Sequence, residues 1–388
     1  MVNPGLERPA RRTTRLGMCK DWLRWGGHAM LVVGLLAATA CQSLPPRPTP
    51  PPVPLVYWAA KDARRSAACA LMLLGSNGRR ARLTPYLECE REMAPLVSPD
   101  GQTVVFPARL GECLYLVSVR ARTVHVVKPP AGRRFKEYEP GLSWAPSSRM
   151  LACVTENMDD TGHASVALVN VAKRRIERQF ARGITGTSLR AIAWSPLGQS
   201  IATGDLDGIT LWSAEGDRQR SLLPVPLPTK LPRRFQAILG MTWSPDGRTL
   251  AFSVFRAPED TLELHTVQAD SKGHRVLDRR YEGMRIVWSP DSRHLLYGRE
   301  GPGGDHQLAV LHTATGKLVE GVGGIPSLHE LDWSRSGKYL LASEREYVPE
   351  TDSVRIGLVA ISFPSGRRAS VLPASPTLGQ GAWCDRAP

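Results

Sequence analysis

The sequence predicts an all-β fold, a β-propeller made of four-stranded blades. Three observations predict it: one short motif recurs at a nearly constant interval, each copy reads as a hairpin, and two further apolar runs follow each copy. The best-formed copy is WSPDGRTLAFSV at residues 243–254. A repeat of about 45 residues that holds four short strands is typical of a propeller blade.

Each copy of the repeat has an anchor residue, and successive anchors are 47, 50, 49, 45 and 45 residues apart. The anchors are Val97, Trp144, Trp194, Trp243, Trp288 and Trp333. A Val, Leu or Ile stands seven residues after every anchor. The alternative, an open β-sandwich whose copies agree by accident, does not explain five tryptophans in one register.

The residues after the anchor predict a tight turn between two strands. In Ser-Pro-Asp-Gly, Ser suits the first turn position, Pro presets φ at the second, and Gly suits the last. The third and fourth strands follow as apolar runs, at 262–268 and 274–278 in one copy and at 307–313 and 317–321 in the next. Each copy therefore supplies a complete four-stranded blade.

The two ends of the chain supply complementary parts of one more blade. Trp383 lies 50 residues after Trp333 and opens a first strand, after which the chain ends. The segment from residue 55 reads as second, third and fourth strands without a first. We therefore expect seven blades, the last one split between the termini, because a ring closed only by loops would leave unpaired strand edges. The alternative is six blades with the terminal segments as decoration.

Residues 1–40 read as a lipoprotein signal peptide. Basic residues precede an uncharged run at 29–40, which is too short to span a bilayer. The run ends in Ala38-Thr39-Ala40-Cys41, which resembles the lipobox of bacterial lipoproteins. The resemblance implies cleavage before Cys41 and acylation of that residue. An ordinary secretory leader is the alternative, and translation could start at Met1 or Met18.

The predicted organisation is a signal peptide at 1–40, a Pro-rich tether at 41–54 and a propeller at 55–388. A Pro-rich segment stays extended and would hold the propeller away from its anchor. More than one acyl chain gives stable membrane attachment. The resemblance to lipoproteins implies an address in the cell envelope outside the cytoplasm. In diderm members of that family, an acidic residue after the acylated Cys favours the inner membrane, so Gln42 implies the outer membrane.

The composition favours anionic partners but excludes no binding function by itself. The formal net charge is +14, which attracts acidic polymers and surfaces. The chain lacks a run of Lys and Arg interleaved with aromatic residues, so we expect no nucleic-acid partner. There are seven cysteines, and their pairing cannot be assigned from sequence.

Catalytic and metal-binding motifs are missing from the sequence. It contains no G-x-S-x-G, H-E-x-x-H, C-x-x-C or phosphate-loop pattern, and its nine histidines are scattered. We therefore predict no cofactor, no metal and no catalytic residue.

The long loops are the predicted binding surface. Connections between second and third strands are acidic, those between blades are basic, and strand alternation places both at the same end of the propeller. Long loops on a rigid scaffold commonly carry recognition. The candidate partner-binding residues are Arg133, Arg134, Arg233, Arg234, Asp159 and Asp160.

The repeated WSPDG-turn-LAF pattern resembles the repeats of TolB-type β-propellers. The resemblance implies the fold and no particular function, because propellers host both binding proteins and enzymes. Our first hypothesis is a monomeric, non-enzymatic propeller that binds an envelope protein or an anionic glycan. The second is a polysaccharide lyase or hydrolase that uses Asp159, His163, Arg234 and His306, and the third is a purely structural platform.

Overall fold

The computed structural model describes residues 53–61, 68–88, 95–136, 141–159, 163–184, 189, 191–205, 208–224, 236–256, 261–282, 285–304, 306–322, 328–351 and 353–384. The chain divides into two units, Met1–Pro46 and Arg47–Pro388, and every described residue lies in the second. Within the described residues, no helix has the length and apolar character needed to cross a membrane.

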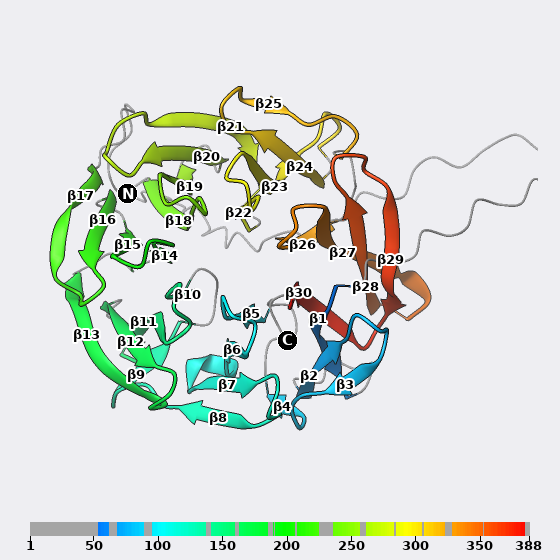
Figure 1. The fold of residues 1–388 in the computed structure, drawn as a ribbon, viewed down its shortest axis with the longest axis horizontal. Helices are drawn as coiled ribbons and strands as arrows, with labels where there is room; N and C mark the ends of the chain where they lie inside the picture. Colours follow the sequence, from blue (N-terminus) through cyan, green and yellow to red (C-terminus); the bar gives the residue numbers. More distant parts are fainter. Residues whose placement is uncertain are drawn as a thin grey trace, which may run out of the picture. The chain divides into compact units, whose positions relative to one another are not determined.

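The described strands form seven blades arranged round a common axis (Figure 1). Blade 1 contains β5 (Leu96–Val97), β6 (Thr103–Pro107), β7 (Leu114–Ser118) and β8 (Val124–Val127), with the short 3₁₀ helix η1 (Arg109–Gly111) between β6 and β7. Blade 2 contains β10 (Leu142–Trp144), β11 (Met150–Asn157), β12 (Ala164–Asn170) and β13 (Arg175–Ile184), plus β9 (Arg133–Phe135). Blade 3 contains β14 (Ala191–Trp194), β15 (Ser200–Gly204), β16 (Gly208–Ser213) and β17 (Arg218–Pro224).

The remaining blades follow the same order from the axis outward. Blade 4 contains β18 (Gln236–Trp243), β19 (Thr249–Arg256), β20 (Thr261–Gln268) and β21 (Arg275–Tyr281). Blade 5 contains β22 (Val287–Trp288), β23 (His294–Glu300), β24 (His306–His312) and β25 (Lys317–Leu318). Blade 6 contains β26 (Leu328–Trp333), β27 (Tyr339–Val348), β28 (Ser353–Ser362) and β29 (Arg368–Ser375), with η3 (Pro349–Thr351) between β27 and β28.

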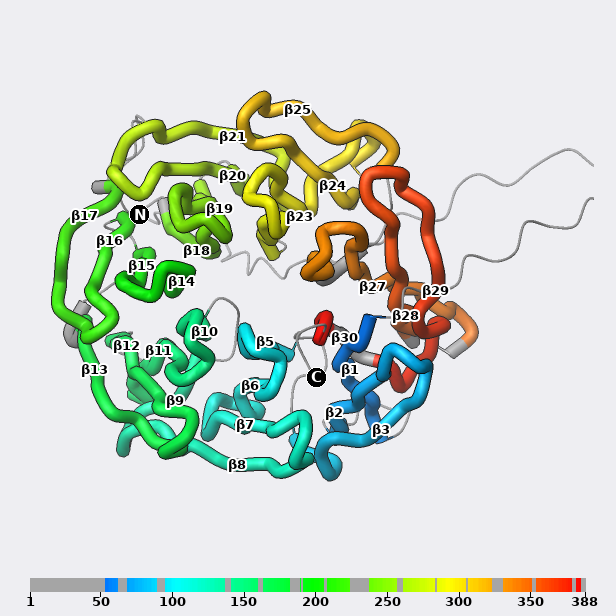
Figure 2. The backbone as a smooth tube through the Cα atoms, viewed as in Figure 1, coloured from blue at the N-terminus to red at the C-terminus, as the bar shows by residue number. Residues whose placement is uncertain are grey.

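Blade 7 joins the two ends of the described chain. Its strands are β30 (Leu378–Trp383), β1 (Leu55–Ala60), β2 (Ala68–Leu74) and β3 (Arg80–Arg82), with the short β4 (Leu87–Glu88) also paired to β2. Strands β30 and β1 are antiparallel, and Trp383 is the partner of Leu55. Figure 2 shows the red and blue ends of the chain side by side. The predicted seven blades and split closing blade are confirmed, and the six-blade alternative is wrong.

The anchor residues hold each blade's innermost hairpin and face the neighbouring blade. Each anchor pairs with the aliphatic residue seven positions later, and the pairs are Val97–Val104, Trp144–Leu151, Trp194–Ile201, Trp243–Leu250, Trp288–Leu295 and Trp333–Leu340. The indole Nε1 of Trp288 donates to the carbonyl of Thr242 in the preceding blade, at 3.1 Å. The indoles of Trp144 and Trp243 make the same kind of bond.

The apolar core is divided among the seven junctions between blades. One cluster joins blade 3 to blade 4 around Trp243 and Phe252, and another joins blade 7 to blade 1 around Trp58 and Phe106. The five other clusters each span two consecutive blades as well. A blade therefore buries its apolar side chains only against its neighbours.

The short turns all lie at one end of the blades, which we call the turn face. In six blades, the carbonyl at the end of the first turn accepts a bond from the backbone N–H of the turn between the third and fourth strands, as in Ala269 N to Arg248 O at 2.8 Å. The connections between second and third strands and between blades lie at the other end, the loop face. Because successive strands of a blade run in opposite directions, short turns and long loops lie at opposite ends of the blades, as the sequence predicts.

The Ser-Pro-Asp-Gly turns close as the sequence predicts. The Ser244 carbonyl accepts from Gly247 N at 2.8 Å, and the Ser244 hydroxyl donates to Asp246 Oδ1 at 2.6 Å. Gly247 has a φ of +71°, which favours glycine. Ser292 occupies the equivalent position in blade 5, and its hydroxyl accepts a bond from Asp246 N at 3.0 Å, so consecutive turns are joined.

We predict that Trp383→Ala destabilises the propeller strongly. Trp383 is buried where β30 meets blade 6, so its loss leaves a cavity at the junction that closes the ring. Large-to-small changes of this kind cost about 3–5 kcal/mol of unfolding free energy. Urea unfolding would measure this loss of unfolding free energy. The control is Val126→Ala on the exposed side of β8, which should change stability by less than about 0.5 kcal/mol. Equal effects of both changes would contradict the closing role of β30.

Candidate functional site

On the loop face of blade 2, the two predicted basic residues, Arg133 and Arg134, bind residues at the end of β11. Strand β9 pairs with β11 beyond the end of β10, and this brings Arg134 opposite Glu156. The Arg134 Nε lies 2.8 Å from Glu156 Oε1. Arg133 donates from Nη2 to the Thr155 carbonyl at 2.7 Å and from Nε to the Thr155 hydroxyl at 3.1 Å. These two candidate partner-binding residues therefore hold the acidic loop of their own blade.

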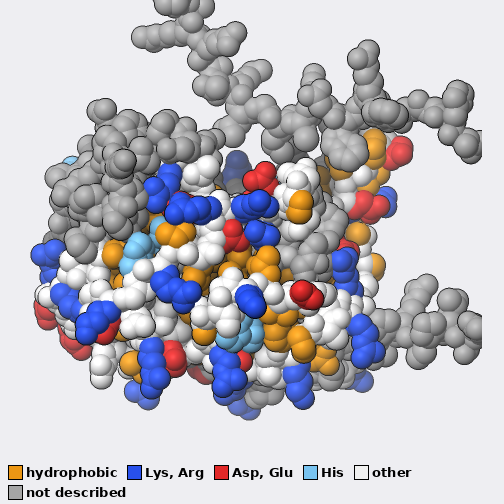
Figure 3. Space-filling model, turned by 90° about the horizontal axis from the view of Figure 1, so that it is seen from above, with side chains coloured by type: hydrophobic (Ala, Val, Ile, Leu, Met, Phe, Trp, Pro, Cys, Tyr) orange, Lys and Arg blue, Asp and Glu red, His pale blue; other side chains and the backbone are white. Residues whose placement is uncertain are grey.

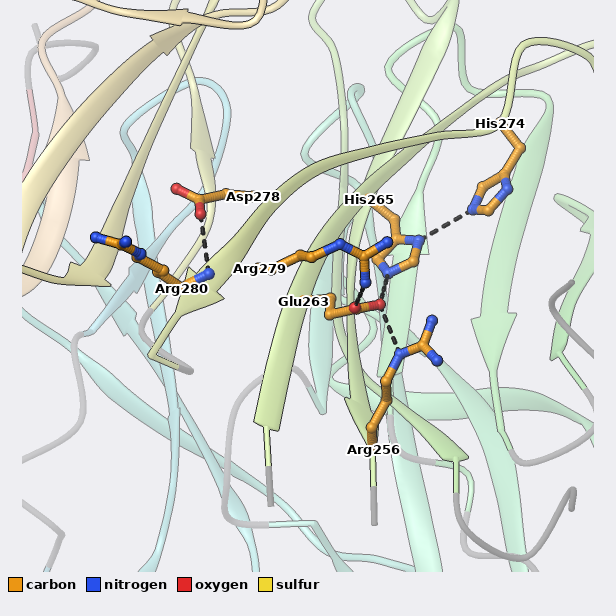
Figure 4. Close-up of polar contacts among 7 residues, drawn as sticks. All are labelled: Arg256, Glu263, His265, His274, Asp278, Arg279 and Arg280. Carbon is orange, nitrogen blue, oxygen red and sulfur yellow. Dashed lines mark hydrogen bonds and ion pairs between the residues drawn. The ribbon is translucent and has the colours of Figure 1, made fainter. Parts of the chain in front are cut away.

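The most concentrated polar cluster of the described loop-face charges lies in blade 4, around Glu263 (Figure 4). Glu263 points inward from β20 and is buried. Its carboxylate accepts a bond from Arg256 Nε at 2.6 Å and another from Arg279 on the neighbouring β21. Because a buried carboxylate needs charged partners, the two guanidinium groups compensate its desolvation.

Two histidines extend this cluster along the blade. His265 Nε2 lies 3.0 Å from Glu263 Oε2, and His265 Nδ1 lies 3.0 Å from His274 Nε2. The two imidazole rings stack with their centroids 5.2 Å apart, and His265 also stacks on Phe252. Burial lowers the pKa of His265 to about 4, against the opposing effect of Glu263, and burial also lowers the pKa of His274. With Nε2–H donating to Glu263, a neutral His265 accepts at Nδ1 the hydrogen bond that His274 Nε2–H donates.

A second acidic centre lies between blades 4 and 5. Asp278 on β21 accepts bonds from the Tyr297 hydroxyl at 2.7 Å and from Arg299 Nε at 3.0 Å. Burial and the neighbouring Asp278 raise the pKa of Tyr297, so this phenol remains a donor. Close by in the chain, Glu282 accepts from His306 Nδ1 at 2.5 Å, and the His306 side chain is largely exposed.

This arrangement can orient groups and move protons, and its charges are largely matched. The Glu263–His265–His274 chain has the connectivity of a proton relay, but its central ring is buried. The Glu282–His306 pair has an accessible imidazole next to a carboxylate. Among the described residues, no group of three or more His, Cys, Asp or Glu side chains is arranged so that it could hold a metal ion.

The loop face also carries most of the large apolar side chains that the described residues expose. Leu110 lies in η1 and Met158 follows β11, and both precede a third strand of their blade. Tyr347 and Val354 face each other across β27 and β28, on the part of that hairpin farthest from the turn face. Tyr86 follows β3. Adjacent exposed apolar side chains are typical of a protein-binding surface, and Tyr347 and Val354 form such a pair.

The structure places the other predicted site residues as follows. Asp159 is exposed at the end of the blade 2 loop, whereas Cys41, Asp160, Arg233 and Arg234 lie outside the described residues. Of the residues proposed for an enzyme, Asp159 and His163 belong to blade 2 and His306 to blade 5, so blades 3 and 4 lie between them.

The sequence analysis missed Glu263, His265 and His274. A signal for them was present in LELHTVQ, where Glu263 and His265 alternate with apolar residues on the same side of the strand as the buried Val267. Charged residues at inward positions of a third strand indicate a buried polar network. Nothing in the sequence indicated that Met158 and Tyr347 are exposed, because their exposure depends on how far each hairpin extends beyond its blade.

Comparison with known proteins supports the fold. No protein-family model matches the chain, and no curated protein sequence matches it. Among solved structures, the Pseudomonas aeruginosa periplasmic gluconolactonase is 15% identical, with a TM-score of 0.55 over 85% of this chain and 98% of the other. An oligogalacturonate lyase in complex with manganese is 14% identical, with a TM-score of 0.54 over 84% and 92%.

A further similar structure is TolB from Acinetobacter baumannii, which is 12% identical with a TM-score of 0.48. The match covers 86% of this chain and 66% of TolB. At these identities, the similarities to the gluconolactonase and to the lyase show the fold alone. The chain has a β-propeller fold, as the resemblance of its repeats to TolB-type propellers implies.

We predict that His265 makes the propeller less stable in acid. Its pKa of about 4 in the folded state lies below the 6.5 of the free side chain, so the unfolded chain binds the extra proton first. The contribution of His265 is complete above about pH 6.5 and is lost as the pH falls through 4, by about 3 kcal/mol in total. Urea unfolding at pH 7 and pH 4 should show a smaller loss for His265→Gln than for wild type.

The matched control for this prediction is His125→Gln, on the outermost strand of blade 1. It should lose as much stability as wild type between the two pH values. If His265→Gln and wild type lose the same free energy, His265 is not the group that titrates.

Proposed function

We propose that the protein is a non-enzymatic binding propeller of the cell envelope, and that its loop face binds a protein partner. One observation carries the proposal: the loop face exposes apolar and aromatic side chains, while the charges clustered around Glu156, Glu263 and Asp278 are paired within the fold. Leu110, Met158, Tyr347 and Val354 are the main exposed apolar residues there. Protein interfaces are enriched in aromatic residues and Met and poor in unpaired charge at their centre.

This distribution favours a protein over an anionic glycan at the loop face. A glycan with carboxylate or phosphate groups needs accessible guanidinium or ammonium donors. On the described loop face, Arg134 and Arg279 already bind Glu156 and Glu263. An anionic ligand would have to compete with these carboxylates, whereas a protein partner can use the apolar side chains beside them.

The proposed site of attachment is the lipid on Cys41, with residues 41–54 as the tether. The support is the resemblance of Ala38–Cys41 to a lipobox and the Pro-rich composition that follows it. Such an anchor would keep the propeller at the membrane and outside the cytoplasm, where envelope proteins are its available partners.

A second candidate function is that of a lyase or hydrolase. The observation that favours it is the Glu282–His306 pair, in which a carboxylate orients an exposed imidazole on the loop face. Such a pair can act as a general base. Crosslinking separates the two functions. A binding propeller should capture a protein at its loop face, whereas an enzyme that acts on a polysaccharide should capture no distinct protein there.

We expect a photo-crosslinking phenylalanine analogue at Tyr347 or Met158 to capture a distinct envelope protein in living cells. The control is the same analogue at Leu197, which is similarly exposed but lies on the turn face. Mass spectrometry would identify the captured protein. Capture of no protein at the loop face, or of the same proteins at all three positions, would contradict the proposed binding surface.

We expect Cys41→Ser to release the protein from lipid attachment. The N-terminal peptide of the wild-type protein should carry the mass of acyl chains and glyceride on Cys41, and the variant should lack that mass. Extraction of membranes with high salt should then remove a larger fraction of the variant than of wild type. An unmodified Cys41 in mature wild-type protein would disprove the anchor.

A further inference from the structure

The turn face repeats a basic residue at a fixed structural position. In every blade except the first, the outermost strand begins with Arg or Lys, and these residues are Arg80, Arg175, Arg218, Arg275, Lys317 and Arg368. All of them are exposed. Figure 3 views the propeller edge-on, from the top of Figure 1, and shows Lys and Arg side chains spread over this side among Asp and Glu side chains.

The turns themselves add a second set of basic residues at the same end. They are Arg79, Arg120, Arg122, Arg149, Lys173, Arg174, Arg248, Lys272, Arg293, Arg335, Lys338 and Arg367, and all are exposed. The described acidic residues of these turns are fewer: Asp100, Glu215, Asp217, Asp246, Asp270 and Asp291. The two sets of basic residues come from all seven blades, so positive charge surrounds the axis at this face.

Many of these basic side chains have no acidic partner among the described residues. Arg149, Arg248 and Arg293 form no ion pair there. The carboxylates of Asp246 and Asp291 bind backbone N–H groups and the serine of their own turn. Ion pairs do form at Arg178–Asp217, Lys173–Glu177, Lys272–Asp270 and, at 4.0 Å, Arg368–Glu344, and the members of each pair are mostly exposed to solvent. The net charge of the face therefore remains available to an external anion.

The chain enters the propeller at this same face. Leu55 begins β1 opposite Trp383, at the position where every complete blade has its first turn. Pro54 accepts a backbone bond from Cys384 N at 2.8 Å, and Leu55 is paired with Leu74 at the start of the turn that carries Arg79. The segment that precedes Val53 therefore joins the propeller beside basic residues of the turn face.

We infer that the turn face docks on the anionic lipid headgroups of the membrane that holds the anchor. The inference rests on the proposed lipid anchor at Cys41, which lies close in sequence to the entry point at Val53. A tether over residues 41–54 reaches at most about 40 Å, so it keeps the turn face near the bilayer. Each basic residue near an anionic membrane strengthens binding by about fivefold.

The shape of the charge distribution favours a membrane over a glycan chain at the turn face. Arginines from successive turns lie around the axis on rigid hairpins, and their charges can meet a flat array of phosphates together. Guanidinium groups bind phosphate oxygens with paired hydrogen bonds. Docking by the turn face would leave the loop face, at the opposite end of the blades, turned away from the membrane and accessible to a protein partner.

The test uses the full chain carrying Cys41→Ser, so that acyl chains do not dominate membrane binding. Co-flotation is measured with vesicles of phosphatidylcholine, with and without phosphatidylglycerol. Arg248→Gln with Arg293→Gln should lower partitioning onto the anionic vesicles about 25-fold, about fivefold for each lost charge. The matched control is Lys61→Gln with Arg355→Gln, which removes two exposed charges from the loop face and should change partitioning less than twofold.

The side chains of Arg248 and Arg293 are exposed, and circular dichroism should show that both double variants fold as wild type does. Equal partitioning of the two double variants would overturn the docking inference. A turn-face variant that loses binding to polygalacturonate but keeps its binding to anionic vesicles would show that a glycan is the occupant. Either result leaves the loop-face crosslinking unchanged, so failure here is distinguishable from failure of the proposed protein-binding function.

Discussion

The structure depends on the fact that no blade has an apolar core of its own. Every described cluster of buried apolar residues is shared by two consecutive blades, and the series runs through blades 7 and 1 as well as through the others. A terminal blade with no neighbour would expose one such cluster to water, at roughly 25 cal/mol for each Å² of apolar surface. Pairing β30 with β1 removes this exposed end and the unpaired strand edges with it.

The same strand alternation separates two surfaces of different chemistry. Short turns leave little freedom, so their charged residues are held apart on rigid hairpins at the turn face. Longer connections can fold back, as β9 does along β11, and bring guanidinium and carboxylate groups together at the loop face. The result is one face with an excess of available positive charge and another with clusters of paired charge and exposed apolar side chains. These two surfaces suit an anionic membrane and a protein partner respectively.

The Glu263 cluster is an exception to the apolar packing between blades. A buried carboxylate with two guanidinium groups and two imidazoles contributes less to stability than an apolar contact of equal volume. The bond between Arg279 of β21 and Glu263 of β20 nevertheless joins these two strands where two irregularities interrupt their pairing. The outer strands of blade 4 therefore depend on polar contacts at a place where the inner strands depend on Trp243 and Phe252.

The sequence alone determined the number of blades, the register of the anchors and the split closing blade. These features follow from local chemistry: a Ser-Pro-Asp-Gly turn specifies its own hairpin, and an aliphatic residue seven positions after Trp243 or Trp288 completes it. Only the tertiary structure decided which charges are paired. Arg134 meets Glu156, and His265 meets His274, because strand register and hairpin length set the distances between side chains. The pairing of Leu55 with Trp383 likewise places the start of β1 beside the end of β30, so the chain enters the propeller at the turn face.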